Sequence, residues 1–190
     1  MSGQGGDELF LGYERYLRWI DQGLLDEESS VTWAENLYFG SGIGNVEQVE
    51  RVTGVSKKYI ETSPIYQWAF ENQDLPPLKR MAIFDQKFRL MYLLKRDDRM
   101  GMGGSVEIRV PFLDRELVSL VNALDDGWKL NGRNQKYLLK RIGRHILPAS
   151  VINSRKLGSP VDFLYWIDTP EFSEKLEELS TDEQSLSRRF

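Results

Sequence analysis

The start of the chain holds its most distinctive chemistry. Residues 2–10 read SGQGGDELF, a glycine-rich turn that runs directly into two adjacent carboxylates and an apolar stretch. A turn of this kind leaves backbone N–H groups pointing at an anion, with acidic side chains beside them. The segment therefore predicts a site for phosphate groups together with magnesium.

Two later segments extend this pattern. Residues 98–114 read DRMGMGGSVEIRVPFLD, and residues 147–167 begin with LP, continue through RKLG and end with WI. In this order the three blocks resemble the synthetase domain of asparagine synthetases, and three ordered blocks are far more specific than one glycine pattern. The resemblance implies a ligase that adenylates the side-chain carboxylate of aspartate with ATP and releases pyrophosphate. Ammonia derived from glutamine then displaces AMP.

The resemblance also assigns roles to side chains within these blocks. Asp7 matches the position that holds Mg²⁺ on pyrophosphate, and Ser2, Gly3 and Gly5 are the expected nucleotide-binding residues. Lys156 matches a lysine that approaches the α-phosphate or pyrophosphate, a task that suits a compact charge on a long stem. Structural interpretations stand beside these: Asp7 could cap a helix, and Lys156 could be an exposed loop lysine.

Gln4 departs from the family pattern, which usually has glutamate there, a residue associated with formation of the aspartyl-adenylate. An amide can donate and accept hydrogen bonds but cannot act as a base, so Gln4 is expected to bind and orient. The departure leaves open which carboxylate accepts nitrogen and whether ammonia is the donor. Glu107 matches a later glutamate that β-lactam synthetase-like enzymes use; its alternative is an ion pair with Arg99 or Arg109. Gln4, Glu107 and Lys156 form the predicted catalytic set.

The composition is that of an ordinary globular protein. The chain has 190 residues, of which 41% are hydrophobic and 28% charged, with a net charge of −4. This balance argues against nucleic acid and anionic membranes as partners and leaves small molecules and protein. The resemblance implies that the small molecules are aspartate, ATP and glutamine-derived ammonia, and a homodimer stays open. The sequence has no cysteine, no signal-peptide pattern and no long apolar run, which predicts a cytoplasmic protein.

Helices are expected to position these residues, because the sequence shows no convincing strand-like alternation. Residues 106–110 are at best a short extended segment. Apolar residues at helical spacing, with caps and breakers, predict helices over residues 9–25, 30–39, 46–52, 56–70, 78–94, 116–124, 134–146 and 171–179.

Further expectations concern particular segments. The helix over 78–94 is interpreted as buried core, and residues 101–104, GMGG, as a loop that delivers Glu107. Arg109 is expected to be buried and paired with an acid such as Asp114. The basic face of the helix over 134–146 is interpreted as solvated, although Lys136 could reach the substrate pocket.

The predicted fold class is mainly α: the helical C-terminal part of an α/β, adenine-nucleotide-hydrolase-like synthetase domain of the PP-loop ATP pyrophosphatase type. Residues 1–190 are interpreted as one domain, a fragment that lacks the glutaminase domain and the pyrophosphate loop. Such a fragment is expected to be inactive alone, because much of the nucleotide positioning is missing. Two alternatives stay open, namely an amide-forming ligase for another carboxylate and a non-catalytic helical interaction module.

Overall fold

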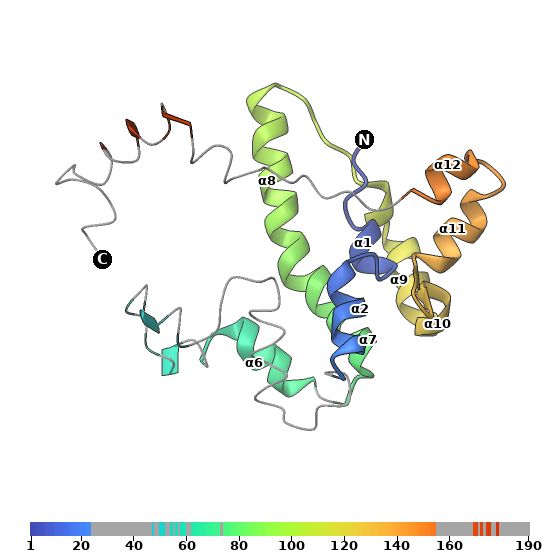
Figure 1. Cartoon of the computed structure of the whole chain (residues 1–190), viewed down its shortest axis with the longest axis horizontal. Helices are drawn as coiled ribbons and strands as arrows, with labels where there is room; N and C mark the ends of the chain where they lie inside the picture. Colours follow the sequence, from blue (N-terminus) through green and yellow to red (C-terminus); the bar gives the residue numbers. More distant parts are fainter. Residues whose placement is uncertain are drawn as a thin grey trace.

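The computed structural model describes residues 1–23, 62–72 and 74–154, with isolated residues between 47 and 59 and between 169 and 178 (Figure 1). The predicted helices over 30–39, 46–52 and 171–179, and the predicted catalytic Lys156, lie wholly or mainly outside these ranges. Within the described ranges the protein is mainly α-helical, as predicted, and its sheet is a single two-stranded hairpin. No helix in this part of the chain is long and apolar enough to cross a membrane.

The longest helical body is formed by three elements that follow one another directly. They are α7 (Pro77–Phe84), the π-helical turn η1 (Asp85–Arg89) and α8 (Leu90–Gly103). The helix predicted over 78–94 is therefore confirmed, but the loop predicted over 101–104 is wrong for all but its last residue. At Gly101 a side chain would lie 2.7 Å from the Val106 carbonyl oxygen, so glycine lets the returning chain pack against the last turn.

The burial predicted for this helical body holds only for its first half. Met81 and Phe84 are buried, whereas Met91 and Tyr92 on α8 are exposed. Leu90, next to them at the start of α8, is buried, so Met91 and Tyr92 lie on the outer side of the helix. Figure 1 shows α1 and α2 beside α7 and the start of α8, while the far end of α8 projects beyond them. Before this body, α6 (Pro64–Glu71) begins at its proline, the first-turn position where proline is tolerated.

The single helix predicted over 9–25 is wrong. The chain forms a four-residue helix α1 (Gly6–Leu9) and a separate helix α2 (Glu14–Asp21). Between them Leu11 has a φ of 53°, and the side-chain amide of Gln135 donates hydrogen bonds to the carbonyls of Leu11 and Tyr13 at 3.2 and 2.7 Å. These tertiary contacts break a stretch whose apolar spacing alone would continue as one helix.

The segment after α8 begins with a single 3₁₀ turn, η2 (Pro111–Leu113), and continues into α9 (Arg115–Ala123). The helix predicted over 116–124 is thus confirmed. The Asp114 carboxylate caps α9 by accepting the N–H groups of Glu116 and Leu117 at 3.0 and 3.2 Å. Asp114 therefore serves a helix terminus, and Asp114 is not the acid that pairs with Arg109.

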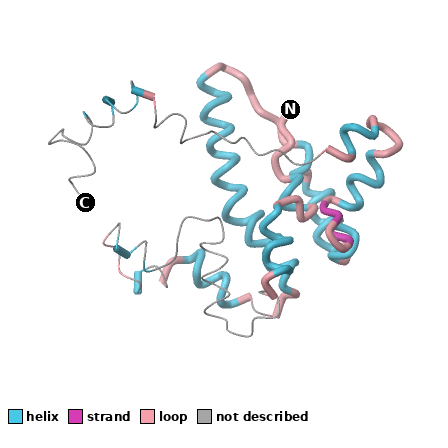
Figure 2. The backbone as a smooth tube through the Cα atoms, viewed as in Figure 1, coloured by secondary structure: helices cyan, strands magenta, loops and turns pink. Residues whose placement is uncertain are grey.

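The helix predicted over 134–146 starts late because a hairpin precedes it. After α10 (Asp126–Lys129), strands β1 (Leu130–Asn131) and β2 (Asn134–Gln135) pair antiparallel, with Leu130 opposite Gln135 (Figure 2). Lys136 follows with a φ of 54°, and only then do α11 (Tyr137–Gly143) and α12 (Ala149–Ile152) form. The loop between the paired residues Asn131 and Asn134 is Gly132-Arg133, and Gly132 has a φ of 57°. Positive φ at the first residue of a two-residue hairpin loop favours glycine, so Gly132 is the sequence signal for this turn.

The core joins the start of the chain to its later helices. Phe10 packs edge-on against Phe112 with ring centroids 6.3 Å apart. Three buried residues form the centre of this cluster and five partly buried ones surround it: Leu9, Phe10 and Val121, with Phe112, Leu117, Val118, Leu138 and Leu139. Burial of these side chains therefore holds α1 against η2, α9 and α11.

Candidate active site at the glycine-rich turn

Two of the motifs found in the sequence meet in space. The backbone N–H of Ser2 donates a 2.8 Å hydrogen bond to the carbonyl of Arg109. Gly6 lies against the ring of Phe112, where a side chain on the glycine would come within 3.5 Å of ring carbons. The start of the chain and residues 109–112 therefore form one structural unit, although a long helical body separates them in the sequence.

The two glycines predicted to bind nucleotide differ in their surroundings. Gly3 is exposed, and a side chain there would meet no heavy atom within 4 Å, so its backbone is open to a ligand. Gly5 is buried with a φ of 90°, and a side chain there would overlap the methyl group of Leu113. Packing and backbone conformation are therefore sufficient reasons for glycine at position 5, and its nucleotide contact stays a prediction.

Gln4 holds a defined position beside α8. Its side-chain amide donates a 2.9 Å hydrogen bond to the carboxylate of Asp97, and its backbone N–H lies 3.4 Å from the Ser2 hydroxyl oxygen. The Asp97 side chain is 18% exposed. An amide that donates to a carboxylate is fixed in orientation, so the geometry fits the orienting role predicted for Gln4.

Asp7 forms an ion pair with Lys136, with the ammonium nitrogen 2.8 Å from one carboxylate oxygen and the two side chains 23% and 30% exposed. The backbone N–H of Lys136 donates to the Phe10 carbonyl at 3.1 Å, which fixes the start of that side chain. A side chain at Gly12 would overlap both partners, so glycine there allows the pair to close. Lys136 thus belongs to the site rather than to a solvated helix face. We call Gly3, Gln4, Asp7 and Lys136 the open rim.

The donor set around Asp7 fits one kind of metal site. No cluster of three or more histidine, cysteine, aspartate or glutamate side chains occurs among the described residues. Magnesium at nucleotide sites, however, is commonly held by one or two carboxylates while phosphate oxygens and waters complete its shell. Asp7 supplies one such carboxylate and is reachable from solvent. It therefore suits Mg²⁺ shared with a phosphate, and not an ion held by protein groups alone.

The neighbouring carboxylate has a different fate. Glu8 is buried and accepts a hydrogen bond from the phenol of Tyr13. Burial, and then the nearby Glu8 carboxylate, hold the pKa of Tyr13 far above its usual value. Glu8 thus fastens the loop between α1 and α2 and is not available as a second metal ligand beside Asp7.

Glu107 lies on the surface. Its carboxylate is 3.0 Å from the guanidinium of Arg109, and the side chains of the pair are 69% and 73% exposed. This matches the ion-pair interpretation with Arg109 and shows that Arg109 is not buried, contrary to the prediction. A pair this exposed contributes little to stability. The catalytic role of Glu107 stays a prediction, as does that of Lys156, which lies outside the described residues.

A buried ion pair that the sequence analysis did not predict joins α2 to the π-helical turn. The Asp85 carboxylate, in the π-helical turn, accepts hydrogen bonds from the Arg15 guanidinium and the Tyr16 phenol. We call Arg15, Tyr16 and Asp85 the buried network. Burial raises the pKa of Asp85 even against the attraction of Arg15, and burial followed by Asp85 raises the pKa of Tyr16. A π-helical turn can aim such a side chain inward at modest cost to the helix.

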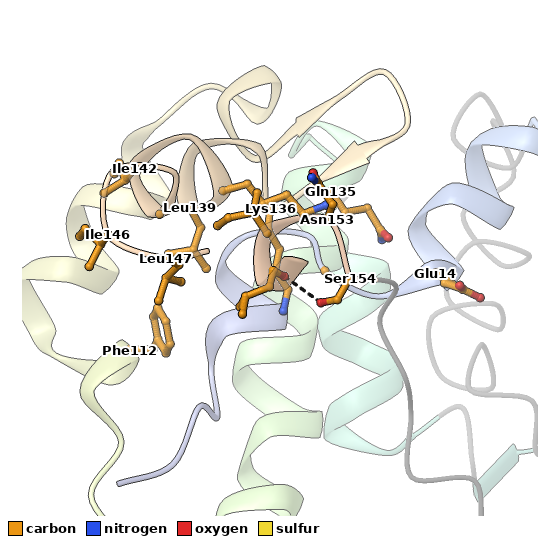
Figure 3. Close-up of a pocket in the computed structure, with 15 residues that line it drawn as sticks. Glu14, Phe112, Gln135, Lys136, Leu139, Ile142, Ile146, Leu147, Asn153 and Ser154 are labelled. Carbon is orange, nitrogen blue, oxygen red and sulfur yellow. Dashed lines mark hydrogen bonds between the residues drawn. The ribbon is translucent and has the colours of Figure 1, made fainter. Parts of the chain in front are cut away.

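A cavity of about 730 Å³ adjoins the open rim (Figure 3). Figure 3 shows Phe112, Ile142 and Ile146 at one end of it and Gln135, Asn153 and Ser154 at the other. Gly12 and Lys136 belong to its wall, so the cavity shares residues with the Asp7 ion pair. Its size falls within the range of small-molecule pockets, which are mostly apolar with a few polar groups.

Comparisons with known proteins agree on one family. The family model described as asparagine synthase matches residues 1–190. Asparagine synthetase (glutamine-hydrolysing) 1 of Bacillus subtilis is 27% identical over 196 residues, which cover 88% of this chain and 31% of that protein. A similar protein of Mycobacterium bovis is 30% identical over 206 residues, which cover 92% of this chain and 31% of that protein. The chain therefore spans less than a third of the length of these relatives. No solved structure matched it.

Proposed function

The chain belongs to the asparagine synthase family, and from this premise we propose that it forms part of an ATP-dependent amidating ligase. The reaction would convert aspartate to asparagine through an aspartyl-adenylate, with ammonia from glutamine, and would release AMP and pyrophosphate. The observation that carries the proposal is that the first seven residues contact both later segments: Ser2 is hydrogen-bonded to Arg109, and Asp7 is ion-paired with Lys136.

Each group of the open rim has a task in this reaction. Adenylation develops negative charge on phosphoryl oxygens, which cations and oriented N–H groups stabilise. Gly3 offers an open backbone for the nucleotide, with Ser2 beside it, and Asp7 would hold Mg²⁺, which neutralises phosphate charge when bound. Lys136 supplies a positive charge on the cavity side. Gln4 orients, while Glu107 and Lys156 complete the proposed catalytic set.

The phosphate half of this proposal can be tested on the 190-residue chain itself. We expect pyrophosphate to bind in a magnesium-dependent manner, measured by isothermal titration calorimetry. Asp7→Asn should weaken that binding by at least ~10-fold, because about 1.4 kcal/mol of charge-assisted interaction is lost. Asp125→Asn, a matched change at an exposed aspartate next to α10, should leave it unchanged. Magnesium-independent binding, or equal affinity in Asp7→Asn, would contradict the role of Asp7.

The ligase half needs the remaining segments of the synthetase. We would replace the matching part of the Bacillus subtilis relative with this chain and assay AMP formation. The proposal expects AMP to form in proportion to asparagine when aspartate, ATP and ammonia are supplied. A folded hybrid that forms no AMP with any carboxylic acid would refute the ligase assignment.

The cavity favours a second candidate, a related amide-forming ligase that acts on another carboxylate. About 730 Å³ next to Lys136 exceeds what free aspartate would fill, and the end near Phe112 and Ile146 is apolar. An acid with an apolar body would bury that body against this end. A panel of carboxylic acids in the same hybrid decides between the candidates: AMP formation with aspartate alone rejects the second, and a strong preference for a larger acid rejects the first.

A further inference from the structure

We propose that Asp97 is the proton acceptor of the amide-forming step, held in place by Gln4. The inference rests on the proposed function, because it assigns a group within the same reaction. Gln4 lies in the glycine-rich motif but cannot accept a proton. The structure places a carboxylate directly on its amide, from a residue outside the motif, with 2.9 Å between the amide nitrogen and the Asp97 oxygen.

Asp97 differs from its neighbours on α8. Residues 95, 96, 98 and 99 are all exposed or nearly so, whereas the side chain of Asp97 is only 18% exposed because it faces the motif. Its other carboxylate oxygen lies 3.3 Å from the guanidinium of Arg96, which is about half exposed. Asp97 is therefore held from one side by an amide and still reaches solvent, the arrangement that a group exchanging protons needs.

The chemistry balances with Asp97 as acceptor. The nitrogen lone pair of ammonia forms the new C–N bond at the acyl carbon of the acyl-adenylate. The C–O bond to the phosphate breaks, and its electron pair leaves with AMP. The nitrogen then carries one proton too many, which passes to the Asp97 carboxylate. Gln4 orients the Asp97 carboxylate, because its amide donates to one carboxylate oxygen. The remaining lone pairs of that carboxylate stay free to accept the proton from the substrate.

A plain tether is the competing role, in which Asp97 only fastens the motif to α8. Asp97→Asn separates the two, because asparagine keeps an oxygen that can accept the Gln4 amide but has no carboxylate. A tether survives this change. A proton acceptor does not, and the loss should fall on amide formation rather than on adenylation.

The first test uses the 190-residue chain and NMR. Ammonium chloride should shift the side-chain amide signals of Gln4 in a saturable way, whereas tetramethylammonium chloride at the same ionic strength should not. The shift should vanish in Asp97→Asn and persist in Asp98→Asn, which removes an exposed carboxylate from the next position of the same helix. No ammonium-specific shift in the wild type, or an unchanged shift in Asp97→Asn, overturns the proposal.

The second test separates the half-reactions in the hybrid synthetase. Asp97→Asn should lower amide formation by ~100-fold or more, the usual scale of general-base catalysis, while ATP–pyrophosphate exchange stays within about twofold. The pH dependence of amide formation should flatten with it. The exchanged pair Gln4→Glu with Asp97→Asn should recover much of the rate. Unchanged amide formation in Asp97→Asn would show a tether, and equal losses in both half-reactions would also overturn the proposal, because the change would then act on the site as a whole and not on proton transfer. A wild-type hybrid that forms no AMP refutes the ligase assignment and the amide-forming step with it, whereas a folded hybrid that forms AMP but keeps its amide-forming rate in Asp97→Asn refutes the role of Asp97 alone.

Discussion

The open rim and the buried network use the same kind of ion pair in opposite surroundings. Asp7 and Lys136 are 23% and 30% exposed, whereas Arg15 and Asp85 are 9% and 3% exposed. Water can solvate either rim partner if the other moves to a ligand. Neither partner in the network can separate without leaving a charge in a medium of low polarity. The exposure of an ion pair, and not its charge, therefore distinguishes a pair that can bind a ligand from one that only stabilises the fold.

The largest change in stability is expected when the carboxylate of the buried network is removed. Asp85→Ala should lower the free energy of unfolding by about 3–5 kcal/mol, because it leaves the Arg15 charge buried without its partner. Urea unfolding followed by circular dichroism measures the loss. A variant that is already unfolded without urea agrees with the prediction, and a loss below about 1 kcal/mol contradicts it.

The glycines give the next largest effect. Gly5→Ala should cost about 1–3 kcal/mol, because alanine must adopt a φ of 90° and would overlap Leu113. Gly3→Ala is its matched control: the space around it is open, so the free energy of unfolding should change by less than about 0.5 kcal/mol. Because the Gly3→Ala variant should be as stable as the wild type, its affinity for magnesium pyrophosphate tests the binding role of Gly3 without a change in folding. Equal stability losses at both positions would remove the distinction between them.

The network should also make stability depend on pH. Burial and then Asp85 hold the pKa of Tyr16 above its usual value, so the native phenol stays protonated where the unfolded chain ionises. Its contribution is complete below pH ~10 and is lost as pH rises above it, at up to about 1.4 kcal/mol per unit. Urea unfolding at several pH values measures this slope.

Tyr16→Phe isolates the contribution of one group. Two other groups affect the dependence of stability on pH in the same pH range. The pKa of Tyr13 is raised by burial and by Glu8, which adds to the slope, whereas the pKa of Lys129 is lowered by burial, which opposes it. Both act equally in wild type and variant, so the difference in slope belongs to Tyr16. Identical slopes would show that the phenol ionises in the native state as it does in the unfolded chain.

The sequence predicted these two regions unequally. The glycine-rich part of the open rim could be predicted, because glycine, amide and carboxylate residues gathered in one short segment rarely serve packing alone. Helices such as α9 could be predicted from apolar spacing and a cap. The buried network could not be predicted, because Arg15 and Asp85 are far apart in sequence and either could have been solvated. Nothing local indicates that a π-helical turn will aim Asp85 inward.

The errors share the same physical cause. Apolar spacing continues across Leu11, but bonds from Gln135 break the helix there. Three of the four residues of GMGG are glycines, which are poor helix formers, yet Gly101 stays helical because the chain packs back on it. In both places long-range contacts outweigh local preference by amounts that a single sequence does not reveal. The sequence indicates Lys136 only as a residue that could reach the pocket, since its partner Asp7 lies far from it along the chain.

A small effect on stability, together with the sharpest test of the comparison, is expected at the rim itself. Lys136→Met keeps the length of the side chain and removes its charge, and the free energy of unfolding should fall by less than about 1 kcal/mol because water can solvate Asp7. The same variant should bind magnesium pyrophosphate several-fold more weakly, measured by calorimetry. Arg109→Met, at the more exposed pair with Glu107, is the control for stability and should change it by less than about 0.5 kcal/mol. If Lys136→Met instead lowers the free energy of unfolding as much as Asp85→Ala and leaves magnesium pyrophosphate binding intact, the Asp7–Lys136 pair also only stabilises the fold. Exposure would then not distinguish the two regions.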